Sequence, residues 1–66
     1  MKLTLDQDRL LLPPETSQKL GIKTSTLAKW RSVGRGPRFV LVGRLPRYRL
    51  SDIDAWLNRN VRGGEQ

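Results

Sequence analysis

Apolar residues along the chain fall into short clusters, and the first cluster follows a proline-rich helix start. The run Pro13-Pro14-Glu15 predicts a helix, because proline is tolerated in a first turn and Glu15 suits the positive end of the helix dipole. This helix should run to about Leu20. Gly21 predicts its end, since glycine readily adopts the left-handed conformation that closes many helices.

A second helix is predicted to begin at residue 23 or 24, directly after this glycine turn. Leu27 and Trp30 stand three residues apart and define its buried edge. The three hydroxyl residues 24–26 all offer capping oxygens, so the position of the N-cap stays open. The glycine- and proline-rich run 34–37 predicts the end of the helix and a turn.

From residue 39 onward, the spacing of the apolar residues changes to that of β-strands. The β-rich run 39–42, the turn-like run 43–46 and the alternating run 47–50 predict a β-hairpin. Within it, the apolar positions should face the core and the two arginines of the second strand should point outward. The expected core positions are Phe39, Leu41, Tyr48 and Leu50, and the expected outward positions are Arg47 and Arg49.

A third helix is predicted from Ser51, which is expected to cap it. Asp54 lies three residues on and approximates a capping box, while Asp52 adds negative charge at the favourable end. Trp56 and Leu57 continue an apolar stripe that begins at residue 53, so Trp56, like Trp30, is interpreted as a core residue.

The order of these elements predicts one mainly α-helical domain with a β-hairpin over residues 12–60. The expected architecture is a winged helix-turn-helix: two helices around a tight glycine turn, a two-stranded wing and a C-terminal helix. Residues 1–11 show no clear period and are expected to be a flexible lead-in, with Leu10 and Leu11 able to pack on the domain. Residues 61–66 are expected to be a flexible tail.

Charge is distributed unevenly along the 66 residues. The chain has 13 basic and 6 acidic residues, a net charge of +7, and every acidic residue lies outside the segment 16–51. That segment holds nine basic residues, and such a cationic surface most commonly binds a nucleic-acid backbone. The nine are Lys19, Lys23, Lys29, Arg31, Arg35, Arg38, Arg44, Arg47 and Arg49.

Several classes of protein are disfavoured by what the sequence lacks. Without cysteine or histidine there is no thiolate site and no usual general base, and Asp52 and Asp54 are explained by helix capping. We therefore expect no enzyme activity, no metal site and no cofactor. No apolar run approaches a membrane span, and the basic residues are spread over different elements. We expect no membrane partner and a cytoplasmic, nucleoid-associated protein.

Two groups of side chains are candidate contacts to double-stranded DNA. If Leu27 and Trp30 face inward, the opposite face of the second helix is small, polar and cationic, which suits entry into the major groove. The hairpin carries arginines that can border a minor groove and hold phosphates. The predicted helix contacts are Lys23, Thr24, Ser25, Thr26, Ala28, Lys29, Arg31 and Ser32. The predicted wing contacts are Arg35, Arg38, Arg44, Arg47 and Arg49.

The stretch from Leu12 to Leu57 resembles the small winged helix-turn-helix domain of excisionase and AlpA-type regulators, which is related to the DNA-binding head of MerR proteins. The similarity is carried by Leu20-Gly21-Ile22, Ser25-Thr26-Leu27 with Trp30, Gly36-Pro37 before Phe39, and Tyr48-Arg49-Leu50-Ser51-Asp52-Ile53-Asp54-Ala55-Trp56-Leu57. It implies a DNA-binding protein of a mobile element that directs excision with an integrase or regulates transcription.

The sequence departs from this family at two places. The family usually has Ser or Thr where Lys23 stands, so Thr24 is expected to take over the cap and shift the helix start by one residue. The family also favours Ala at Thr16 and Ser17 of the first helix. Only a short segment follows Leu57, so no small-molecule effector region is expected.

The preferred interpretation is sequence-selective binding of double-stranded DNA. One small domain makes few base contacts, so selectivity should come from further copies on adjacent sites, from DNA bending or from an integrase or recombinase partner. Two alternatives stay open. One is a small RNA-binding protein, and the other is a protein-interaction module such as an antitoxin or an anti-repressor.

Overall fold

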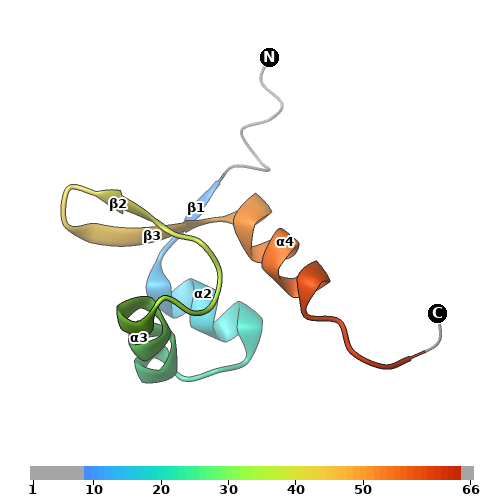
Figure 1. Cartoon of the computed structure of the whole chain (residues 1–66). Helices are drawn as coiled ribbons and strands as arrows, with labels where there is room; N and C mark the ends of the chain where they lie inside the picture. The colour runs from blue at the N-terminus through green and yellow to red at the C-terminus, as the bar shows by residue number, and fades with distance from the viewer. Residues whose placement is uncertain (1–8, 65–66) are drawn as a thin grey trace, which may run out of the picture.

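The computed structural model describes residues 9–64 (Figure 1). Helices α2 and α3 lie side by side, the β2–β3 hairpin projects from the body, and α4 continues from β3. This arrangement confirms the mainly helical fold with a hairpin wing. The elements are β1 (Leu10–Leu11), α2 (Pro13–Leu20), α3 (Thr24–Val33), β2 (Val40–Val42), β3 (Leu45–Arg49) and α4 (Leu50–Arg59).

Helix α2 has the bounds that its proline start and glycine end predict. At its start, the backbone N–H of Leu12 donates to Oε1 of Glu15 at 2.8 Å, so the glutamate satisfies a backbone donor at the helix entry. At its end, Gly21 has a φ of 72°, and the N–H of Ile22 donates to the carbonyl of Ser17 at 3.0 Å. This left-handed closure turns the chain sharply toward α3.

The inward side of α2 carries two hydroxyl residues where the related family favours alanine. Thr16 is fully buried and Ser17 is 5% exposed. Both hydroxyls donate to backbone carbonyls about one turn earlier, Thr16 to the carbonyl of the N-cap residue Leu12 at 3.0 Å and Ser17 to the Pro14 carbonyl at 2.9 Å. These hydrogen bonds replace the ones that the two hydroxyls would make to water. Helix α2 therefore packs against the rest of the domain with both buried hydroxyls hydrogen-bonded.

The sheet has three antiparallel strands in the order β1-β3-β2, so it adds one strand to the predicted two-stranded wing. Leu10 pairs with Arg49 and Leu11 with Tyr48, and Leu11 is only 3% exposed. Leu11 therefore packs on the domain, as the sequence allowed, whereas the pairing of Leu10 and Leu11 as a strand of the sheet was not predicted. The open edge of β3 supplies their hydrogen-bond partners, and the core holds the Leu11 side chain. Residues 1–8 lie outside the described residues.

The hairpin turn is tighter than predicted. Gly43 and Arg44 alone separate β2 from β3, with Gly43 at a φ of 65°, as two-residue hairpin loops favour. Within this hairpin, Leu41 is 62% exposed and Phe39 is 37% exposed, so the prediction that both face the core is wrong. They share a face with buried residues, but the hairpin extends past the helices that would cover them.

Helix α4 begins at Leu50, one residue before the predicted cap. The N-cap is Arg49, and the Leu50 N–H donates to the Arg9 carbonyl at 2.9 Å. Ser51 therefore lies inside the helix, and its prediction as the cap is wrong. The partly buried Leu50 side chain packs on the core, which draws the helix start to the end of β3. Residues 61–64 follow α4 outside any helix or strand.

The hydrophobic core gathers one side chain from each of four elements. Leu11, Leu27, Tyr48 and Ile53 are buried, and Leu20, Ile22, Trp30 and Leu50 pack around them. The rings of Trp30 and Trp56 lie 5.5 Å apart between centroids, tilted by 45°. Trp30 packs against the core as predicted, whereas Trp56 is half-buried and packs on Trp30 at its edge; ring pairs of this geometry are stabilising.

The approach of Gly36 to Trp30 leads to a stability prediction. Gly36 has a φ of 83°, and a Cβ there would lie 2.8 Å from Cε3 of Trp30, whereas Gly34, with a φ of 75°, has open space around it. Both Gly→Ala changes should cost about 1–2 kcal/mol for the left-handed backbone. Gly36→Ala should cost roughly 1–3 kcal/mol more, because the indole must move. Urea unfolding measures both, and equal losses for the two variants would contradict the contact.

Candidate nucleic-acid interface

The orientation of α3 is fixed by its one fully buried residue, Leu27. With Leu27 in the core, the opposite side of the helix faces solvent. Four residues of that side are exposed, as predicted from the helical wheel: Ser25, Ala28, Lys29 and Ser32. The side is small and polar around a single cation, which suits close approach to a groove.

The start of α3 differs from the expectation that Thr24 becomes the cap. Lys23 occupies the N-cap with an extended backbone, and no side chain caps the helix. The Thr24 hydroxyl instead lies 3.3 Å from the Ser17 hydroxyl on α2, within hydrogen-bond distance. Thr24 thus joins the two helices, and the side chains of Lys23 and Ser25 are exposed beside it, while Thr26 is half-buried.

Arg31 has a structural partner that the sequence does not indicate. It is half-buried on the flank of α3, and its Nη1 donates to the Tyr48 hydroxyl at 3.1 Å. The guanidinium therefore connects α3 to β3. Its predicted contact to DNA would have to use the nitrogens that face away from Tyr48.

The wing arginines divide into free and paired groups. Arg44 lies at the hairpin tip and is exposed. Arg47 is half-buried and its Nη1 donates to the Pro46 carbonyl at 2.7 Å, so the prediction that it simply points outward is only partly correct. Arg49 is exposed and forms an ion pair with Asp52 at 3.5 Å. Exposed ion pairs of this kind are weak and can exchange for a phosphate.

Several cations around α3 and the hairpin form no ion pair within residues 9–64 and are exposed: Lys23, Lys29, Arg35, Arg38 and Arg44. The carboxylates of the described segment belong to other elements. Glu15 lies at the start of α2, and Asp52 and Asp54 lie in α4. Within residues 9–64, the surface of α3 thus carries positive charge that no carboxylate pairs with. Within the same described segment no cluster of three potential metal ligands exists.

The structure also exposes residues that the sequence reasoning missed. Val33 ends α3 on its outward side and is 55% exposed. At the hairpin tip, Leu41, Val42 and Leu45 are each at least half exposed. For Val33 the signal was present in the sequence, because it follows Lys29 by four residues and so shares its side of the helix.

The two-helix unit and its wing can be compared with known domains. A helix-turn-helix domain family model matches residues 10–61, which includes β1 and all of α2 to α4. No curated protein sequence matches the chain. None of the helices between residues 9 and 64 is long and apolar enough to cross a membrane. The family match covers most of the chain and indicates DNA as its partner. The chain therefore belongs to the helix-turn-helix domain family of small excisionase- and AlpA-type DNA-binding proteins.

Proposed function

We propose that this protein binds selected sites on double-stranded DNA of a mobile element, as an excisionase or as a small transcriptional regulator. Helix α3 would enter the major groove, and Arg44 would reach the adjacent minor groove while neighbouring arginines hold phosphates. The observation that carries the proposal is the exposed side of α3, where Lys29 stands among small polar residues and no carboxylate. A DNA-binding role of this kind needs no catalytic group, cofactor or small-molecule effector. We expect a protein with this role to be associated with the nucleoid.

Two observations bear on the alternative functions. Recognition of single-stranded RNA usually relies on exposed aromatic rings on a sheet. Here Tyr48 is fully buried, and Trp30 packs against Trp56. Phe39, which is 37% exposed just before β2, is a single ring and does not make a row of exposed aromatics. A protein partner is favoured by the exposed aliphatic side chains at the hairpin tip, of which Leu41 is the most exposed at 62%. An integrase or a second copy on an adjacent site is therefore the alternative partner of this tip, in place of a minor groove.

The main test is selection from a pool of randomised duplexes at fixed salt, followed by titration of the selected site. If five to seven phosphates are contacted, log affinity should fall with log salt with a slope of about −5 to −6. Structured RNA serves as the competitor. A nearly flat salt response, or preference for the RNA, would contradict duplex recognition.

Lys29→Ala tests the helix contact, and Lys19→Ala is its matched control, since Lys19 is an exposed lysine on α2. If Lys29 reads a guanine, its loss should cost about 1–3 kcal/mol at the selected site and relax the preference for one base. Lys19→Ala should leave the base preference intact. Binding constants on the selected and scrambled duplexes measure both, and equal weakening on both duplexes would reassign Lys29 to a phosphate.

Arg44→Ala tests the wing. Removal of the exposed tip cation should weaken binding at physiological salt and make the salt slope less steep by about 1. The measurement is a titration of the selected duplex at several salt concentrations. Unchanged affinity would place the hairpin tip away from DNA and leave it for a protein partner.

The two biological roles separate in two further assays. An excisionase should stimulate excisive recombination by an integrase from the same element. A regulator should change transcription from a promoter beside the selected site, without an integrase.

A further inference from the structure

One residue on the outward side of α3 does not fit a purely polar contact surface. Val33 is the last residue of the helix and is 55% exposed, although it is apolar. It lies four residues after Lys29, which in turn lies four residues after Ser25. These three side chains therefore form one stripe along the helix. The stripe ends in an aliphatic group instead of another polar one.

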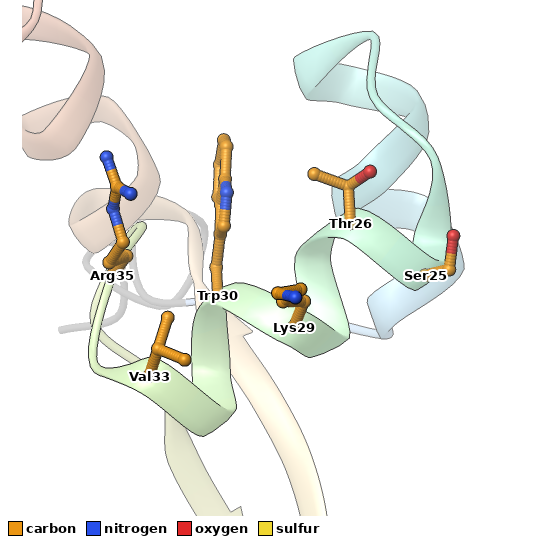
Figure 2. Close-up of a pocket in the computed structure, with 6 residues that line it drawn as sticks. All are labelled: Ser25, Thr26, Lys29, Trp30, Val33 and Arg35. Atoms are coloured by element: carbon orange, nitrogen blue, oxygen red, sulfur yellow. The ribbon is translucent and has the colours of Figure 1, made fainter.

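Val33 also borders a hollow in the surface. The hollow has a volume of about 340 Å³ and is lined by Ser25, Thr26, Lys29, Trp30, Val33 and Arg35. Figure 2 shows Trp30 standing between Arg35 on one side and Thr26 on the other, with Val33 near the Arg35 end. The indole and the valine give the hollow an apolar wall, and the exposed cations Lys29 and Arg35 lie at its margin.

An apolar spot bordered by cations has a specific complement in duplex DNA. The major groove presents one apolar group on the unmodified base pairs, the 5-methyl group of thymine, and apolar side chains recognise it. The Lys29-to-Val33 spacing corresponds to about 6 Å along the helix axis, which is roughly two base-pair steps. Lys29 can thus reach one base while Val33 contacts a pyrimidine close by, and phosphates neutralise the surrounding cations.

We propose that Val33 is a specificity-determining residue that contacts the 5-methyl group of a pyrimidine, which in unmodified DNA is thymine. This inference rests on the proposed function, because it requires α3 to lie in the major groove. If Val33 makes this contact, the preferred DNA site contains a thymine close to the base that Lys29 reads. The methyl group enters the hollow beside Trp30. Val33 contacts the methyl group from the side of the hollow nearest the C-terminal end of α3.

The experiment replaces each thymine of the selected duplex, one at a time, with deoxyuridine, which removes only the methyl group. At one position near the Lys29-dependent base, the intact protein should bind the uracil duplex about fourfold more weakly. That ratio corresponds to about 0.8 kcal/mol for one buried methyl-sized group. Val33→Ala should bring this ratio toward one, because it removes the two γ-methyl groups of the valine that make most of the contact. Alanine favours helix, so this variant should stay folded.

Val61→Ala is the matched control, since Val61 is 68% exposed and lies beyond α4. It should keep the fourfold ratio. Two further duplexes carry cytosine or 5-methylcytosine at the sensitive position. Tighter binding of the 5-methylcytosine duplex than of the cytosine duplex supports the same contact with a 5-methyl group. If every thymine tolerates uracil, or Val33→Ala keeps the ratio, the assignment of Val33 is overturned while duplex binding stands. Absence of duplex binding by the intact protein would instead overturn the proposed function itself.

Discussion

The position of α3 relative to the hairpin depends on Tyr48, whose side chain is fully buried in the sheet. Its backbone pairs with Leu11, its ring lies 6.0 Å from the Phe39 ring between centroids, and its hydroxyl accepts a hydrogen bond from Arg31. A buried hydroxyl without a partner would be costly, so the sheet can hold this tyrosine because the arginine reaches it. Tyr48 thus links α3, through Arg31, to the sheet that carries the hairpin.

The small size of the chain explains how this surface stays free. A domain of this length buries a modest share of its surface, and within residues 9–64 only four apolar side chains form its buried core: Leu11, Leu27, Tyr48 and Ile53. Thr16 and Ser17 complete the interior with hydroxyls that bond to nearby carbonyls, and they let α2 approach α3 closely. As a result, the side chains on the outward side of α3 contribute little to the packing of the core. Its polar and cationic residues can be selected for a partner instead of for stability.

Local signals were enough to predict the two helices of the helix-turn-helix and the hairpin. Prolines, Gly21 and the spacing of Leu27 and Trp30 act within a few residues of one another. Strand β1 could not be predicted, because two residues carry no period and their partners lie far along the chain. Alternation showed that Leu41 shares a face with core residues, but it does not show whether anything covers that face.

The same limit applies to the predicted contact residues. A helical wheel separates the buried and exposed sides of α3, and it placed Lys29 and its polar neighbours correctly. It leaves Arg31 on the flank, where only the three-dimensional fold reveals Tyr48 as its partner. The contribution of each of these residues to DNA binding stays a prediction. Sequence and fold show which side chains are exposed, and binding measurements show which of them contact DNA.

The junction between β3 and α4 has a structural consequence. The strand ends at Arg49 and the helix starts at Leu50, with no loop between them, and the Leu50 N–H is held by the Arg9 carbonyl. The direction of β3 therefore sets the direction in which α4 leaves the sheet. Because Ile53 of α4 is fully buried and Trp56 packs against Trp30 of α3, this junction ties the wing to the core that also holds α3.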